Sequence, residues 1–222
     1  FLKRFEAKGA ALLNINLTLP LQNVTERSFA GRVEFMDSAF RDRLWNLELG
    51  GLNGRLNFAS HGDLIHFDLP QMLGKLNQRD VIVSADSHSN IPDKTVSTEI
   101  KVLTRMSVVE LMGDYASLAK GLVRGVADWR MALTIKQRRE LAPKIQVSLG
   151  SKLVGVEVNL PQGFGKAFAD EHAFLLEADI THQQLNTFSL QYGQWVHSLF
   201  TVSHSGGMPK LDRGEIRFGG DK

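Results

Sequence analysis

Apolar and polar residues alternate along most of this chain. The clearest runs are residues 13–19, 144–149 and 153–160, where every second side chain is Leu, Ile or Val. A period of two places successive side chains of a strand on opposite faces of a sheet. The pattern therefore predicts a large β-sheet with one apolar face.

Thirteen segments of this kind, joined by short connections, favour antiparallel β structure over βαβ units. Two of the connections, His61-Gly62-Asp63 and Tyr192-Gly193-Gln194, have the composition of hairpin turns. We expect strands near residues 10–19, 29–37, 52–60, 62–69, 80–88, 95–103, 127–135, 144–151, 153–160, 173–181, 186–192, 195–203 and 211–218.

One segment has a helical period instead. Ser107 with Glu110 three residues later fits a capping box, and Gly121 fits a C-terminal stop, so we expect an amphipathic helix over residues 107–121. Its apolar stripe consists of Val108, Leu111, Tyr115 and Leu118. Such a helix plugs one end or one face of the sheet by default, and a mobile gate or a membrane-surface helix are the alternatives.

A short sequence motif, which we call the Leu-Pro-Gln echo, occurs once in each half of the chain. Residues 68–76 resemble residues 159–167, because both have Leu-Pro-Gln followed by Gly-Lys after an alternating strand. Proline ends a strand ladder because it lacks an N–H group. The echo suggests two repeats, at about 1–105 and 106–222.

Size and composition leave one large all-β domain or two smaller ones open. The 222 residues are 43% hydrophobic and 23% charged, as in an ordinary folded protein, and no apolar run reaches the roughly 18–20 residues that span a bilayer. The chain begins at Phe1 and ends in Gly-Gly-Asp-Lys. We expect an interior fragment of a longer protein.

Charge and cysteine content exclude several functions. A net charge of +2 is too small for a nucleic-acid binder, and the one dense basic run, residues 136–139, is interpreted as a solvated loop, with contact to an anionic lipid headgroup as the alternative. The absence of cysteine excludes disulfides, thiolate metal sites and cysteine nucleophiles.

No catalytic or cofactor motif is recognisable. The seven histidines form no His-Glu-x-x-His pair, Ser and His occur without a Gly-x-Ser-x-Gly elbow, and no glycine-rich loop opens a helix with Lys-Ser/Thr. The sequence therefore predicts a protein that is not an enzyme and that needs neither metal nor cofactor.

Residues 145–167 resemble a motif of the AsmA-like YhdP proteins of Gram-negative bacteria, in which a serine and Leu-x-Gly precede an alternating strand and Leu-Pro-x-Pro-Leu-Gly-Lys. The chain keeps Ser151, Leu153, Gly155, Leu160, Pro161, Gly165 and Lys166. It departs at Gly163-Phe164, where the family has Pro-Leu, so the turn there can differ. Residues 52–58, and the helix followed by Gly125 and Trp129, also fit, so the resemblance covers roughly residues 40–185.

The resemblance implies a non-enzymatic module of a bridge-type lipid-transfer protein, which supports phospholipid transport between the inner and outer membranes and the integrity of the outer-membrane barrier. Its parent protein would be periplasmic and anchored in the inner membrane by a segment absent here. The implied fold is a long, strongly twisted antiparallel sheet curved into a groove. The implied partners are phospholipid acyl chains, neighbouring modules of the same chain and envelope proteins.

The alternating positions supply the candidate residues for lining such a groove. In a closed sandwich the same residues would form an ordinary core, and the protein would then be a structural or assembly module that binds envelope proteins. The candidates are Leu13, Ile15, Leu17, Leu19, Val33, Phe35, Leu56, Phe58, Val81, Val83, Met131, Leu133, Ile135, Val154, Val156, Val158, Phe174 and Leu176.

Overall fold

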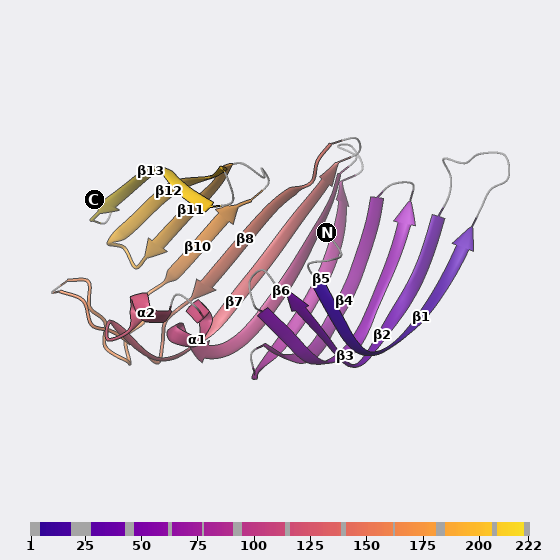
Figure 1. The fold of residues 1–222 in the computed structure, drawn as a ribbon, viewed down its shortest axis with the longest axis horizontal. Coiled ribbons are helices and arrows are strands. Elements are labelled where there is room, and N and C mark those ends of the chain that lie inside the picture. Colours follow the sequence, from indigo (N-terminus) through magenta and orange to yellow (C-terminus); the bar gives the residue numbers. More distant parts are fainter. Residues whose placement is uncertain are drawn as a thin grey trace. The chain divides into compact units, whose positions relative to one another are not determined.

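The computed structural model describes residues 5–18, 28–42, 47–61, 64–76, 78–90, 95–113, 116–138, 141–161, 163–180, 185–205 and 208–219. Within these residues thirteen strands form one antiparallel sheet (Figure 1). The order is β1-β2-β3-β4-β5-β6-β7-β8-β10-β11-β12-β13, and β9 pairs with β7 off this path. The predicted fold class, mainly β with one large antiparallel sheet, is confirmed.

Most strands lie where the alternation predicts them and are longer than expected, but the strand expected at 153–160 is reduced to three residues of β9, because the chain turns at residues 154–155. The first six strands are β1 Phe5–Thr18, β2 Ser28–Asp42, β3 Leu47–His61, β4 Leu64–Leu76, β5 Arg79–Asn90 and β6 Thr95–Ser107. The remaining strands are β7 Val123–Arg138, β8 Lys144–Ser151, β9 Val156–Val158, β10 Phe174–Asp179, β11 Leu185–Tyr192, β12 Val196–Ser205 and β13 Met208–Phe218. Because β7 continues to Arg138, most of the basic run at residues 136–139 belongs to a strand and not to the expected loop.

The chain divides into two compact units. The first contains Phe1–Val102 and Thr134–Lys144, and the second contains Leu103–Leu133 and Ile145–Lys222. The two-repeat organisation stays a prediction.

The first unit has one apolar face, which the strand register assembles. Leu13 of β1 lies opposite Val33 of β2, which lies opposite Leu56 of β3. In the same way Phe58 of β3 lies opposite Phe67 of β4. Directly paired residues share a face, so the alternating positions of these strands form one apolar surface.

The opposite face of the first unit is polar. The Arg32 guanidinium donates to the Asn57 side-chain oxygen over 3.1 Å, and the Asn57 amide donates to the Asp68 carboxylate over 3.1 Å. Arg55 forms an ion pair with Glu34 on the neighbouring strands at 2.9 Å. The alternation in the sequence therefore gathers polar side chains on this face, although the exposed Leu12, Leu73 and Ile82 also lie on it.

A line of β-bulges crosses β1 to β4, and β1 to β3 bend at it (Figure 1). The irregular positions are Gly9, Asp37, Gly51 and Pro70, and the first three have positive φ angles of 97°, 50° and 59°. Bulges bend strands and increase their twist. We call this line the crease.

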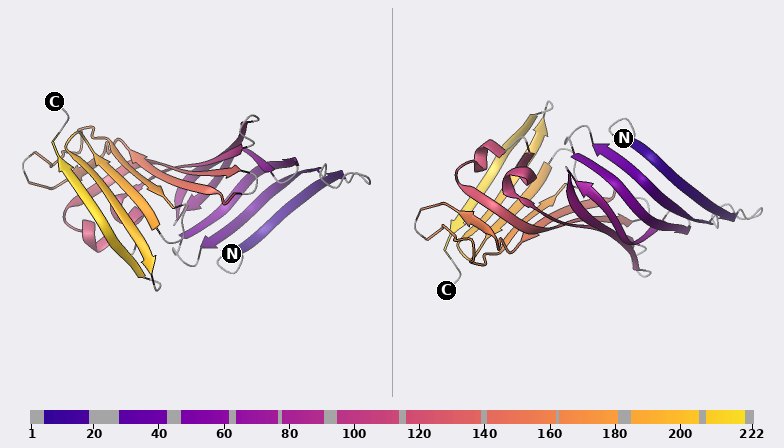
Figure 2. Two further views of the ribbon diagram at one scale, coloured as in Figure 1. Left: turned by 90° about the horizontal axis from the view of Figure 1, so that it is seen from above. Right: turned by 90° about the horizontal axis from the view of Figure 1, so that it is seen from below.

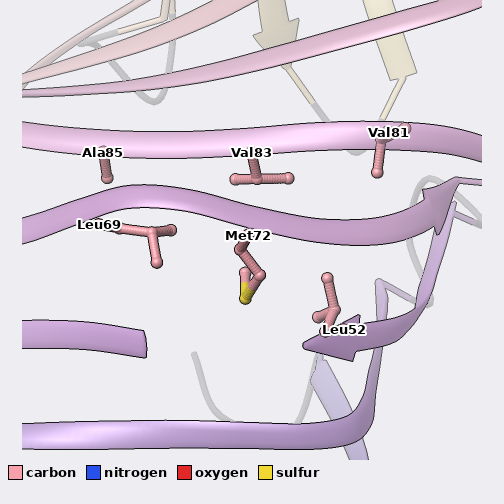
Figure 3. Packing of buried hydrophobic residues seen from close by; sticks show 6 residues of the cluster. All are labelled: Leu52, Leu69, Met72, Val81, Val83 and Ala85. Atoms are coloured by element: carbon pink, nitrogen blue, oxygen red, sulfur yellow. The ribbon is translucent and has the colours of Figure 1, made fainter. Parts of the chain in front are cut away.

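The buried core of the first unit lies next to the crease. It consists of Leu52, Leu69, Met72, Val81, Val83 and Ala85, which Figure 3 shows gathered between β3, β4 and β5. Gly54 and Gly74 leave room for it, because a Cβ atom at these positions would lie 2.8 Å from Met72 Cγ and 2.6 Å from Leu52 Cδ2. The side chains that pack around this core all come from strands of the same sheet.

We predict that Gly9→Val destabilises the first unit by about 2–4 kcal/mol, because it combines backbone strain with a steric clash. Gly9 has a φ of 97°, and a Cβ atom there would lie 2.6 Å from the Asp37 carbonyl oxygen. The matched control is Gly50→Ala, whose nearest contact would be the Ala39 Cβ at 3.8 Å. Urea denaturation of both variants is the measurement, and equal stabilities would show that the crease does not need glycine.

The predicted helix begins where expected but is short. The Glu110 N–H donates to the Ser107 hydroxyl, and the Glu110 carboxylate accepts from the Ser107 N–H, which confirms the capping box. The chain then leaves the helix at Gly113, so the segment forms α1 Val108–Met112 and α2 Ala116–Ala119, which lie together on one side of the second unit's strands (Figure 2). Of the predicted stripe, Tyr115 and the Leu118 side chain lie outside the described part.

Of the two predicted hairpin turns, only the one at residues 192–194 lies wholly within the described residues. β11 and β12 pair up to Tyr192 and Val196, and the connection between them includes Gly193 at a φ of 56°, so this hairpin is confirmed. His61 and Leu64 pair at the ends of β3 and β4, but residues 62–63 lie outside the described residues.

The two copies of the Leu-Pro-Gln echo have different conformations. Pro70 does not end its strand as expected, because β4 continues past it through a bulge between Leu69 and Met72. Pro161, in contrast, follows the short strand β9 and opens a turn in which the Phe164 N–H donates to its carbonyl oxygen over 3.0 Å.

Candidate apolar lipid-contact faces

The candidate lining residues of the first unit differ widely in exposure. On β1, Leu13, Ile15 and Leu17 are 53%, 49% and 67% exposed. On β5, Val81 and Val83 are buried in the core. Val33, Phe35, Leu56 and Phe58 on β2 and β3 are partly buried, as is Ile135, and Leu19 lies outside the described residues.

No helix of the described part belongs to the first unit, because α1 and α2 both lie within the second. The core cluster of this unit and the partly buried hydrophobic residues packed on it all come from strands of the sheet. Close to the crease this packing is complete, and towards β1 it leaves large apolar side chains open to solvent. An exposed apolar surface of this kind is typical of a binding face.

The second unit also carries an apolar face. Phe174 and Leu176 of β10 lie opposite Tyr192 and Leu190 of β11, and all four share a face. The Trp129 ring of β7 packs edge-on against Phe174, with ring centroids 5.8 Å apart, which places Trp129 on this face as well. The alternating candidates Met131 and Leu133 follow Trp129 along β7 and are partly buried, like Phe174 and Leu176.

The remaining candidates lie in and around β9, away from the main path of the sheet. Val156 and Val158 are buried against β7, so they pack as core of the second unit. Val154, two residues earlier, is about half exposed. The three valines therefore differ in burial, although the alternating pattern treats them as equivalent.

A buried lysine holds the connection between β8 and β10. The Lys166 ammonium donates to the carbonyl oxygens of Val156 at 2.7 Å and Ala167 at 2.8 Å, while its backbone pairs with Val158 in both directions. Burial lowers the pKa of Lys166, and the Asp170 carboxylate opposes this shift. The alternation pattern does not reveal this role; the only sequence signal is that Lys166 closes the Leu-Pro motif.

We predict that Lys166→Met lowers the free energy of unfolding of the second unit by about 1–3 kcal/mol, because two carbonyl groups lose a charged donor. The control is Lys152→Met, which removes an exposed ammonium that pairs with Glu171 at 2.9 Å and is expected to cost less than about 1 kcal/mol. Chemical denaturation compares the two variants. A smaller loss for Lys166→Met than for Lys152→Met would contradict this account of the connection.

Two shallow hollows of the second unit lie on its polar face. The first, of about 280 Å³, is lined by polar side chains such as Glu177, Gln191 and His197 together with Leu175 and Leu199. The second, of about 340 Å³, lies beside Asp128, Arg130 and Lys152. Asp128 and Arg130 alternate with Trp129 along β7, so this hollow faces away from the apolar side.

The described residues contain no group of three or more His, Cys, Asp or Glu that could hold a metal ion. His88 forms an ion pair with Asp86 at 2.9 Å, and His172 packs against the rings of Tyr192 and Trp195. Among the helices of the described part, none has the length and apolar character needed to cross a membrane.

The fold and its surfaces define the class of protein. It is built on one large antiparallel sheet, and each of its two units has an apolar face and a polar face. The chain matches the family described as YhdP protein over residues 1–222. It therefore belongs to the YhdP family, as the motif around Lys166 suggests. No curated protein and no solved structure matches it.

Proposed function

We propose that this chain is a non-enzymatic lipid-conduit module whose apolar faces hold phospholipid acyl chains. The observation that carries the proposal is the open apolar face of the first unit, where Leu13, Ile15 and Leu17 are 53%, 49% and 67% exposed. Membership of the YhdP family is consistent with lipid transport in the cell envelope.

The energetics favour many apolar contacts over a few specific ones. Transfer of a 16-carbon chain into water costs on the order of 12 kcal/mol, at about 0.8 kcal/mol per methylene. A continuous set of Leu, Ile, Val and Phe side chains lowers this cost without any chemical step. The proposed site of action is the periplasm, with the parent protein anchored in the inner membrane.

Neighbouring modules of a longer chain are the proposed protein partners. Within the described sheet, β1 pairs only with β2 and β13 only with β12. Each of these strands therefore has an edge with backbone N–H and C=O groups that an adjoining strand can pair. Other envelope proteins are further candidates for these edges.

Native mass spectrometry of the chain purified under mild conditions from a Gram-negative host tests the proposal. We expect co-purified phospholipid that is released on unfolding. A chain that is folded and lipid-free, and that also fails to take up phospholipid from added vesicles, would favour a structural module of the envelope.

A further inference from the structure

The connection between β7 and β8 joins two neighbouring strands of the sheet and belongs to the first unit (Figure 1). The Leu141 N–H donates to the Arg138 carbonyl oxygen over 3.2 Å and closes the turn. Leu141 is 61% exposed, and Ala142 and Pro143 are exposed as well. The connection therefore presents an uncharged, mainly apolar segment to solvent, residues 141–143, which we call the tip.

Basic side chains flank the tip on both strands. Arg138 lies three residues before Leu141 and Lys144 lies three residues after it, and Lys136 shares a face of β7 with Arg138. All three cations are exposed. Among the described residues, none forms an ion pair with any of them. We call Lys136, Arg138 and Lys144 the basic flank.

The positive charge of the whole chain is concentrated in this connection. Residues 136–144 include four Lys or Arg and one Glu, a net charge of +3, whereas the complete chain has a net charge of +2. All other residues together therefore have a net charge of −1. A partner that the chain attracts by its positive charge is expected to meet it here.

The combination of tip and basic flank fits the surface of an anionic bilayer. A single exposed leucine is common on protein surfaces, but Leu141 lies at the end of a hairpin between cations without ion-pair partners. Lipid phosphates attract Lys and Arg, whose aliphatic stems let the charged groups stay at headgroup level. An apolar side chain between them then enters the boundary between headgroups and acyl chains. An acidic protein surface would pair the cations but gives no reason for an uncharged tip.

We propose that the connection between β7 and β8 docks on an anionic lipid bilayer. The basic flank contacts lipid phosphates, and Leu141 enters the boundary between headgroups and acyl chains. This contact goes beyond the proposed lipid-conduit function, because the apolar faces that hold acyl chains take no part in it. It adds a membrane surface to which the first unit attaches.

Flotation of the 222-residue chain with lipid vesicles tests the proposal. One vesicle contains equal parts of phosphatidylcholine and phosphatidylglycerol, and the other contains phosphatidylcholine alone. We expect binding to the anionic vesicle to be stronger by about tenfold or more and to weaken as salt is added, because salt screens exposed charges. Equal binding to both vesicles would overturn the proposal, since apolar contact alone would then explain it.

A triple variant locates the contact. Lys136→Gln, Arg138→Gln and Lys144→Gln together remove the basic flank, and we expect binding to the anionic vesicle to fall by about tenfold to a hundredfold. All three side chains are exposed, so the fold is expected to persist, and a thermal melt checks this. Unchanged binding in the folded variant would overturn the proposal.

The matched control removes the same charge elsewhere in the chain. It replaces three exposed lysines by glutamine, namely Lys8, Lys120 and Lys210. Both triple variants have the same net charge, and we expect the control to bind anionic vesicles within about threefold of the parent, because the attraction falls off within a Debye length. Equal losses in the two variants would show that net charge, and not this connection, controls binding, which would overturn the proposal.

A fluorophore at the tip tests whether Leu141 enters the bilayer. The chain has no cysteine, so Leu141→Cys gives one site for a thiol-linked nitrobenzoxadiazole label. Leu73→Cys is the control, because Leu73 is 54% exposed in the same unit and lies outside the connection. On addition of anionic vesicles we expect a blue shift at position 141 and none at position 73. No shift at position 141 in the bound protein would overturn insertion of the tip.

The outcomes separate this contact from the lipid-conduit function. A basic-flank variant that loses vesicle binding and still co-purifies with phospholipid would support both. A chain that docks through the basic flank but never holds phospholipid would support the contact and contradict the conduit. A chain that holds phospholipid but does not bind anionic vesicles would overturn the contact alone.

Discussion

Val81→Asp is expected to destabilise the first unit by about 3–5 kcal/mol or to prevent it from folding, because an unpaired carboxylate would enter a packed apolar site. Val81 is 2% exposed and lies in the core beside Leu52 and Val83. It lies opposite Gly74, so no charged side chain directly across the pair can compensate the carboxylate. Urea denaturation gives the loss directly.

The neighbouring residue provides the control. Ile82 is 40% exposed and lies on the opposite face of the same strand, opposite the exposed Leu73. Ile82→Asp is expected to change the free energy of unfolding by no more than about 1 kcal/mol. If Val81→Asp were as stable as Ile82→Asp, Val81 would face an open groove and the core at the crease would be wrongly placed.

The second large effect concerns lipid occupancy. We expect the double variant Leu13→Asp and Ile15→Asp to lose bound phospholipid about tenfold or more while it stays folded, because acyl chains do not solvate carboxylates. Both side chains are about half exposed on the apolar face of β1. Native mass spectrometry measures the occupancy, and a thermal melt checks the fold.

A matched double variant on the polar face of β1 tests whether the loss of lipid is specific to the apolar face. Leu12 is as exposed as Leu13, at 53%, but lies opposite Glu34 on the polar face, and Asn14 lies opposite Arg32. Leu12→Asp with Asn14→Asp adds the same charge to the same strand and is expected to keep its lipid. Equal loss in both double variants would mean that charge on β1, rather than the apolar face, controls binding.

Period-two alternation was sufficient to predict the sheet, because side chains on successive residues of a strand point to opposite faces regardless of the rest of the fold. It could not predict the crease. Gly9, Asp37 and Gly51 become neighbours only through the register of β1, β2 and β3, and no local pattern encodes that register. Pro70 was misleading for the same reason, because a bulge accommodates it inside β4.

The helix shows the limit of periodicity on a short segment. The capping box at Ser107 is a local signal and was predicted correctly, since both of its hydrogen bonds form within four residues. The apolar stripe continues beyond Gly113, yet the chain leaves the helix there at a φ of 53°. The periodic apolar stripe was therefore not enough to keep the helix continuous past Gly113.

The sequence could not distinguish exposed from buried members of the lining set, because exposure depends on what covers each strand. Leu13 and Val81 have the same place in the alternation, but Val81 packs in the core cluster whereas Leu13 on the edge strand β1 is 53% exposed. The role of Lys166 was likewise hidden, since its partners are backbone carbonyl groups that no residue pattern identifies.

The most direct test of the central claim compares the two faces at one position of β1. The chain has no cysteine, so Leu12→Cys and Leu13→Cys each give one site for a thiol-linked bimane fluorophore. On addition of phosphatidylcholine with a doxyl group in its acyl chain, we predict strong quenching at position 13 and little at position 12. Equal quenching at both positions, or none at position 13 in a folded protein, would contradict acyl-chain binding on the apolar face.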